Sequence, residues 1–406
     1  MRMAKTVTTG RPPREVLAWS RELTGPPLRA AVETLPASMR RIAAYHFGWQ
    51  DESGRPASGN AGKAVRPALV LLAAEAAGGS AAAAVPAAVA VELVHNFSLL
   101  HDDVMDGDAT RRHRPTAWSV FGVSGAILAG DALLTLAFEV LRSGGHPAAD
   151  EAARVLGAAV LDLVEGQSAD TSFETRDEVG LAECVSMAEG KTAALLAASC
   201  ALGALSGDGG PEVIESLRAF GSRLGLAFQM VDDLLGIWGD PAVTGKPVFS
   251  DLRSRKKSLP VVAALTSGTP AGTELAAFYR HGQPPTLAGQ APALTARLSA
   301  QPSPPATPMP PPFAQASPPA APMPPPLAQA SPLAAQMPSP AAQVSATAEL
   351  ARAADLIEAA GGRAWTQARA DELLAEALAH LAATGPAPRP AAELHTLAHL
   401  LAHRDH

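Results

Sequence analysis

Residues 99–112 read LLHDDVMDGDATRR, and the first half of this stretch sets three carboxylates at the end of a strongly apolar helical pattern. Asp102 and Asp106 are four residues apart, so they share one face of a helix. Burying unpaired carboxylates is costly unless cations neutralise them. Hard oxygen donors on one face, followed by Arg111 and Arg112, are typical of a site where Mg²⁺ holds a phosphorylated ligand.

A second acidic pair, Asp232-Asp233, also follows an apolar run. Two such pairs in one helical chain, more than a hundred residues apart, predict two acidic walls that face each other across a diphosphate bridged by divalent metals. A solvated helix end is the simpler interpretation of either pair, although the apolar surroundings argue against it. An EF-hand loop does not fit the first pair, because its third and twelfth positions would be Val104 and His113.

The rest of the chain is helical in pattern. Apolar residues recur at every third or fourth position, Ala is abundant, and aromatic residues make up only 4% of the chain. We therefore expect an all-α fold built as one large helical bundle. The expected helices span 67–77, 88–105, 125–142, 148–166, 181–205, 211–238, 257–265, 346–361, 366–383 and 391–403.

The stretch 301–340 differs in kind. It holds 16 of the 37 prolines and a 14-residue repeat that begins at Pro308 and again at Pro322. Because proline lacks a backbone donor and blocks helices, this stretch should be extended or disordered. The expected organisation is therefore a flexible leader at 1–25, one helical domain over 26–282 and 346–406, and a disordered Pro/Ala-rich insertion at 283–345.

Composition excludes several classes of protein. The net charge of −7 argues against nucleic-acid binding, and Cys184 and Cys200 are too few for a disulfide framework. No signal peptide or membrane span is evident, since the longest candidate, 81–100, contains Glu92 and His95 and fits a buried helix better. We expect a cytoplasmic protein.

The chain resembles the trans-polyprenyl diphosphate synthase family. Residues 99–112 match its first aspartate-rich motif and 225–233 match its second. Shorter landmarks follow in family order at 62–67, 92–95, 166–167, 191–192, 245–247 and 257–260. The resemblance covers about residues 30–275 and, more weakly, 346–403, and it implies the isoprenoid synthase type of helical bundle.

The resemblance also implies an enzyme that joins isopentenyl diphosphate to an allylic diphosphate by Mg²⁺-assisted ionisation. Asp102 and Asp106 would bind two Mg²⁺ ions and Asp232 a third, with Asp103 and Asp233 in support. This chain departs from the family pattern at Gly236, where many members carry a third aspartate. The allylic diphosphate would be held by Arg111, Lys191 (also a catalytic candidate), Thr192, Gln229 and Lys246, with Lys257 nearby, and isopentenyl diphosphate by Lys63, Arg66, His95 and Arg112. On residue type alone, each of these cations is more often a solvated surface charge.

Product length is expected to depend on Phe97 and Ser98, which lie five and four residues before Asp102. A Phe there would narrow the channel for the growing prenyl tail, and the pattern resembles geranylgeranyl (C20) producers more than farnesyl (C15) producers. A farnesyl diphosphate synthase is therefore the nearest alternative. Simple core packing of Phe97 is an equally good interpretation.

Other functional classes fit less well. A class I terpene cyclase would lack the second aspartate pair, and a non-catalytic synthase subunit would usually have lost motif residues. The resemblance suggests a homodimer. The repeat in 301–340 is similar to segments of prenyl transferases that look like cargo of encapsulin shells, so docking inside such a nanocompartment is one interpretation and a neutral expansion is the other.

Overall fold

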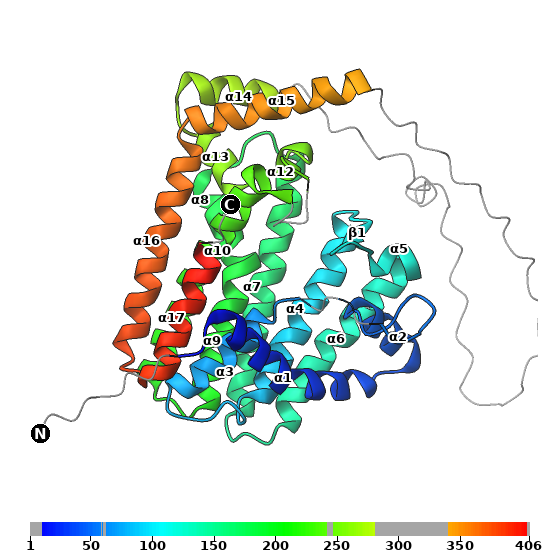
Figure 1. Cartoon of the computed structure of the whole chain (residues 1–406), viewed down its shortest axis with the longest axis vertical. Coiled ribbons are helices and arrows are strands. Elements are labelled where there is room, and N and C mark those ends of the chain that lie inside the picture. Colours follow the sequence, from blue (N-terminus) through cyan, green and yellow to red (C-terminus); the bar gives the residue numbers. More distant parts are fainter. Residues whose placement is uncertain (1–9, 58, 60–61, 242–246, 281–339, 404–406) are drawn as a thin grey trace, which may run out of the picture. The chain divides into compact units, whose positions relative to one another are not determined.

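The structure is a computed structural model that describes residues 10–57, 59, 62–241, 247–280 and 340–403 (Figure 1). In these ranges the regular elements are helices apart from one short hairpin, in which β1 (Thr110–Arg111) pairs antiparallel with β2 (Arg114–Pro115), and an isolated bridge between Gln50 and Pro56. The all-α prediction is confirmed. By contacts the chain forms two compact units, residues 1–282 with 350–406 and residues 283–349, and the first is described here.

The first half of the chain forms α1 (Pro13–Glu33), α2 (Ala37–His46), α3 (Val65–Ala76), α4 (Val85–Met105), α5 (Ala117–Phe121), α6 (Val123–Ser143) and α7 (Ala149–Thr175). The second half forms α8 (Leu181–Ala188), a π-helical turn η1 (Glu189–Ala193), α9 (Ala194–Ser206), α10 (Pro211–Trp238), α12 (Ser250–Arg253), α13 (Leu259–Leu265), α14 (Pro270–Arg280), α15 (Pro340–Ala359), α16 (Gly362–Ala383) and α17 (Pro388–Ala402).

Two expected boundaries are wrong. The flexible leader ends by Pro13, where α1 begins, because proline is well suited to the first turn of a helix and the apolar side chains that follow, including Val16 and Leu17, are buried. The expected insertion ends before residue 345, since α15 begins at Pro340. The docking segment and repeat otherwise lie outside the described residues, as do residues 1–9.

Helices α4 and α10 carry the main packing contacts of the first unit. Helix α4 packs on α3, α6 and α9, while α10 packs on α9 and α16. The side chains of α4 are buried on most sides between Ala87 and Leu100, so this helix carries the first acidic motif out of the core to its end. Small residues allow close helix contacts, and a Cβ added at Gly207, directly after α9, would lie 2.5 Å from the carbonyl oxygen of Ala74 in α3.

One described helix, α6, is long and apolar enough to cross a membrane by length and composition. The sequence predicts no membrane span, and the stretch 81–100, which we expected to be a buried helix, lies largely in the buried core helix α4. Only 33% of the most apolar window of α6 is buried in this chain. The helix therefore presents apolar side chains on its surface.

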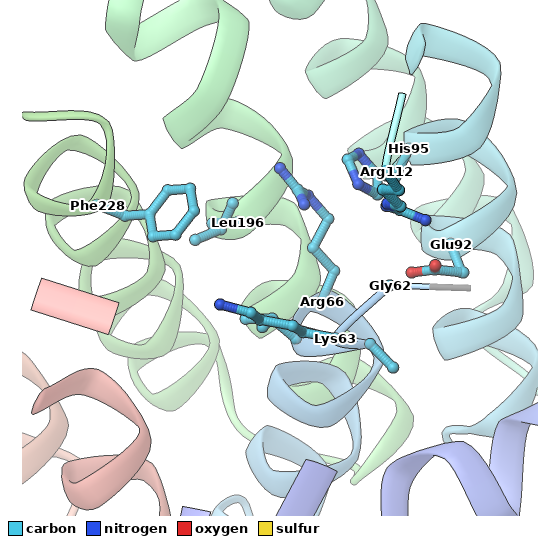
Figure 2. A pocket seen from close by; sticks show the side chains of 10 residues that line it. Gly62, Lys63, Arg66, Glu92, His95, Arg112, Leu196 and Phe228 are labelled. Atoms are coloured by element: carbon cyan, nitrogen blue, oxygen red, sulfur yellow. The ribbon is translucent and has the colours of Figure 1, made fainter. Parts of the chain in front are cut away.

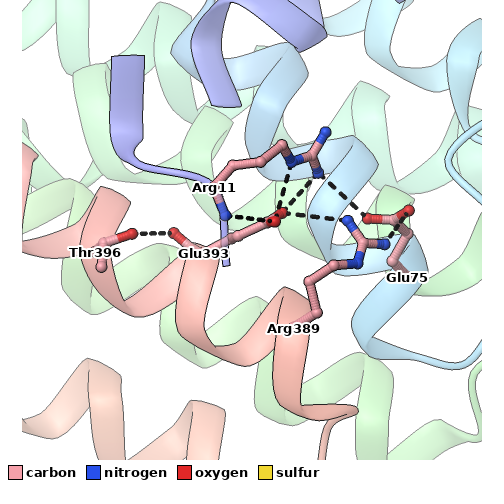
Figure 3. A network of polar contacts seen from close by, with 5 residues as sticks. All are labelled: Arg11, Glu75, Arg389, Glu393 and Thr396. Atoms are coloured by element: carbon pink, nitrogen blue, oxygen red, sulfur yellow. Dashed lines mark hydrogen bonds and ion pairs between the residues drawn. The ribbon is translucent and has the colours of Figure 1, made fainter. Parts of the chain in front are cut away.

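The two ends of the described chain meet in a network of arginine and glutamate side chains (Figure 3). The Glu393 carboxylate, whose side chain is fully buried, accepts hydrogen bonds from the Arg11 backbone N–H at 3.0 Å and from Arg11 Nη2 at 2.6 Å. Arg389 donates to Glu75 of α3 at 2.7 Å. Burial raises the pKa of Glu393, but hydrogen bonds and charge from Arg11 and Arg389 outweigh it and hold that pKa below its usual value.

Arg11→Ala should lower the free energy of unfolding by about 2–3 kcal/mol, because it leaves the buried Glu393 carboxylate with only the 3.5 Å contact to Arg389. Denaturant unfolding followed by circular dichroism measures this. The matched control is Arg14→Ala, which removes an exposed arginine of the same helix end. Equal stability of the two variants would contradict a stabilising role for the network.

Candidate active site

The first acidic wall is the C-terminal end of α4, and its three carboxylates differ in environment. Asp103 is 1% exposed and accepts a hydrogen bond from Arg111 Nε at 2.6 Å, so it braces the hairpin that follows. Asp102 and Asp106 lie on the more open face. Burial raises the pKa of Asp102 to about 6, an effect opposed by Lys191 and reinforced by Asp106.

Lys191 stands beside this wall on the π-helical turn. Its amine pairs with Asp170 of α7 at 2.5 Å. The sequence predicts an unbroken helix over 181–205, but the structure inserts η1 there, and such single π turns are common at functional sites. Gly166 and Gly190 let α7 and η1 approach closely, because a Cβ at Gly190 would lie 2.6 Å from a backbone oxygen of α7.

The second acidic wall lies on α10. Like the first wall, it has one buried, hydrogen-bonded carboxylate and one exposed carboxylate. Asp233 is 3% exposed and is fixed by hydrogen bonds from Gln229 Nε2 at 2.7 Å and from the Leu259 N–H at 2.9 Å. Gln229 in turn accepts a bond from Thr192 at 2.6 Å. Burial raises the pKa of Asp233 to about 7. Asp232 is exposed, so each pair contributes one structural and one open carboxylate.

The amine of Lys256 interacts electrostatically with carboxylates of both walls. Although burial opposes its charged form, Asp170, Asp233, Asp251 and Asp232 hold the pKa of Lys256 above its ordinary value. The same amine acts on Asp106 of the first wall. The two walls therefore share one electrostatic environment.

Lys257, the residue expected near the allylic diphosphate, is bonded to the backbone at the end of α7. Its amine donates to the backbone oxygen of Phe173 at 2.5 Å, and burial lowers its pKa. Its neighbour Lys256, by contrast, interacts electrostatically with Asp106, Asp232 and Asp233. Lys246 lies outside the described residues.

A separate pocket of about 120 Å³ opens next to the walls (Figure 2). Figure 2 shows Arg66 between Leu196 on one side and His95 with Arg112 on the other. Lys63 also lines the pocket, so the four residues assigned to isopentenyl diphosphate come together. The complete lining is Gly62, Lys63, Ala64, Val65, Arg66, Glu92, His95, Arg112, Leu196 and Phe228.

The pocket is strongly cationic. Burial, together with Arg66 and Arg112, lowers the pKa of His95 well below its usual value, so its ring is neutral at pH 7. The only carboxyl group in the lining is Glu92, whose pKa is raised by burial. Gly62, at φ +96°, is required here, because a Cβ would lie 2.8 Å from the Arg112 guanidinium. The pocket thus fits an anion that needs no metal.

Phe97 and Ser98 lie on α4 below the first wall and are 6% and 8% exposed. The Phe97 ring meets His101 edge to face at 4.8 Å, and Ser98 Oγ donates to the backbone oxygen of His95 at 2.9 Å. Sequence reasoning missed Asp170 and Asp251, and it favoured Lys257 over the neighbouring Lys256. Asp170 could have been found, because it lies four residues after Gly166 on the same face of a helix.

Comparison with known proteins gives a consistent pattern. Residues 49–290 match the family model described as polyprenyl synthetase. The chain is 45% identical over 389 residues to a (2E,6E)-farnesyl diphosphate synthase of Mycobacterium tuberculosis, covering 96% of this chain and 92% of that protein. It is 52% identical over 268 residues to a geranylgeranyl diphosphate synthase of the same species, covering 66% of this chain and 77% of that protein.

Among solved structures, the chain is similar to a polyprenyl synthetase from Streptomyces coelicolor A3(2). The TM-score is 0.77 at 42% identity, with 95% of this chain and 98% of that chain covered. The similarity therefore extends over the whole helical unit, including both acidic walls and the cationic pocket.

Proposed function

Because the chain belongs to the polyprenyl synthetase family and is therefore a prenyltransferase enzyme, we propose that it condenses isopentenyl diphosphate with an allylic diphosphate. The observation that carries this proposal is the presence of two neighbouring sites that could each hold a diphosphate in a different way, one through metal ions and the other directly through cationic side chains. One has open carboxylates with Lys191 and Lys256, and the other has Lys63, Arg66 and Arg112. A reaction between two diphosphate esters needs both.

The open carboxylates fit Mg²⁺. Asp102, Asp106 and Asp232 offer hard oxygen donors, and in the described part of the chain no three His, Cys, Asp or Glu residues form a complete cage. Mg²⁺ commonly binds through one or two carboxylates and the phosphates of a substrate, so an incomplete protein cage is what a substrate-bridged site requires. We assign up to three ions to these residues.

The condensation follows from this arrangement. The bond between the allylic carbon and the diphosphate oxygen breaks, and its electron pair leaves with the diphosphate. Lys191, Arg111 and Lys256 hold the charge that grows on this leaving group. Bound Mg²⁺ adds Lewis-acid stabilisation of the same charge. The double bond of isopentenyl diphosphate attacks the allylic cation, and loss of a proton to the released diphosphate restores a double bond.

Incubation with Mg²⁺, isopentenyl diphosphate and each allylic primer in turn tests the proposal. We expect incorporation of isopentenyl diphosphate and a C20 end product. A C15 end product would establish the farnesyl alternative. Conversion of an allylic diphosphate without such incorporation would establish a terpene cyclase, and no turnover would establish a non-catalytic subunit.

Phe97→Ala should lengthen the end product by at least one five-carbon unit, because the ring fills space beneath the first wall. Chromatography of the dephosphorylated products measures the change. Phe220→Ala is the matched control, since it removes a fully buried ring from a different core cluster and should change stability only. An unchanged product profile in Phe97→Ala would assign this ring to core packing.

We also propose that two copies associate through the outer face of α6 and α7. Of the eight large apolar side chains that are exposed in the described ranges, five lie on these helices: Val123, Ile127, Leu128, Leu161 and Val164. A second copy covering this face would remove the apolar surface from water.

Leu161→Asp should convert the dimer into a monomer, because this side chain is 72% exposed on the proposed face and a charge there could not be desolvated. Light scattering after gel filtration measures the mass. Leu400→Asp, on α17, is the control that should leave the mass unchanged. A Leu161→Asp variant with the wild-type mass would exclude this interface.

A further inference from the structure

The second acidic wall has a glycine, Gly236, at the position of a third acidic residue, yet the space there is not empty. A Cβ added at Gly236 would lie 2.5 Å from Oδ1 of Asp251, far inside contact distance. Asp251 is 9% exposed and belongs to α12, fifteen residues further along the chain. The Asp251 carboxylate thus occupies the space that a side chain at position 236 would need.

The backbone around Asp251 holds this carboxylate in place. Ser250 Oγ lies 3.0 Å from the Gly236 carbonyl and 3.2 Å from Asp251 Oδ1, so it links α12 to α10. The Lys256 N–H donates to the Asp251 carbonyl at 2.8 Å and closes the turn after α12. Phe249 and Arg255 flank the turn with φ of +62° and +53°. Left-handed residues other than glycine persist where surrounding contacts over-determine them, which is common at functional sites.

The charge of Asp251 acts on two groups of the candidate site, the Lys256 amine and the Asp233 carboxylate. It is one of the carboxylates that favour the charged form of the Lys256 amine, and it also acts on Asp233. The Asp251 carboxylate therefore packs against α10 at Gly236 and interacts electrostatically with Lys256 and Asp233.

We propose that Asp251 is the third carboxylate of the second acidic wall, a positioning residue that reaches the site because Gly236 leaves it room. It holds the Lys256 amine toward the diphosphate and adds negative charge beside Asp232, where a divalent cation would bind. This assignment rests on the proposed function.

An exchange of the two residues tests the proposal. Gly236→Asp places two carboxylates in one space, so it should unfold at a lower temperature than wild type in EDTA and lose activity. The double variant Gly236→Asp/Asp251→Gly should regain most of both losses. Gly236→Ala is the control for added bulk without charge. Additive losses in the double variant would overturn the proposal.

Asp251→Asn provides the second measurement, because it removes the charge and keeps the shape. We expect the Mg²⁺ concentration for half-maximal rate to rise about 10-fold. We also expect a smaller rise in melting temperature when Mg²⁺ and inorganic diphosphate are added together. A purely structural role would change the melting temperature in EDTA and leave both of these readouts at wild-type values, which would overturn the proposal. If wild type does not consume isopentenyl diphosphate, the proposed function fails, while the melting experiment still tests Asp251.

Discussion

Asp102→Asn should lower kcat by about 1,000-fold at saturating Mg²⁺ while the metal-free protein becomes more stable. The amide keeps the shape of the side chain but cannot supply the negative charge that a divalent cation requires, and loss of one group that stabilises transition-state charge costs about 10²–10³ in rate. Single-turnover assays with an allylic diphosphate and isopentenyl diphosphate measure the chemical step.

The expected effect of Asp102→Asn on the stability of the metal-free protein is an increase at high pH. Burial raises the pKa of Asp102 from 3.8 to about 6, so the fold disfavours its ionised form. In EDTA this group contributes stability that is present in full below pH 3.8 and is lost as the pH rises through about 6. Asn removes that loss, so the melting temperature of the variant should exceed that of wild type at pH 8.

Two controls separate charge at the site from charge elsewhere. Asp150→Asn changes an exposed carboxylate in the first turn of α7 and should leave kcat unchanged. Asp103→Asn should lower kcat less than Asp102→Asn does, because Asp103 is buried and pairs with Arg111 at 2.6 Å instead of lying on the open face. A kcat for Asp102→Asn close to that of Asp150→Asn would remove Asp102 from the proposed machinery.

Helices with an apolar stripe could be predicted from the sequence because their signal is local. The expected helix over 211–238 has the observed bounds of α10. Features of the helices that leave no mark on the apolar pattern were not predicted from the sequence. The π turn at 189–193 adds a residue without disturbing the apolar pattern, and α1 was hidden by Pro13 at its start and by Pro26 and Pro27 in its interior.

The residues of the candidate site also fall into two groups, those with a local sequence signal and those whose role depends on tertiary packing. Motif residues such as Asp102 and Asp232 could be selected because carboxylates are unusual beside apolar runs. Asp251 and Lys256 could not, because their roles depend on the packing of α12 against α10, which no spacing in the sequence encodes. The choice of Lys257 over Lys256 illustrates this limit, since adjacent lysines differ only in the direction that the fold gives them.

Arg66→Ala should raise the KM for isopentenyl diphosphate by about 100-fold and change kcat much less. The guanidinium stands in the middle of the cationic pocket (Figure 2), and a charge-assisted hydrogen bond contributes about 1.5–3 kcal/mol, so loss of one or two such bonds is a loss of this size. Steady-state kinetics with the allylic substrate held at saturation measures it.

The conservative variant and a surface control make this result specific. Arg66→Lys keeps the charge but loses the planar pair of donors, so its KM should rise only about 10-fold. Arg154→Ala, which removes an exposed arginine of α7, should leave the KM at the wild-type value. If Arg66→Ala raised the KM for the allylic substrate and left that for isopentenyl diphosphate unchanged, the two diphosphates would have to exchange sites. The cationic pocket would then hold the leaving group, and the acidic walls would need another ligand for their metals.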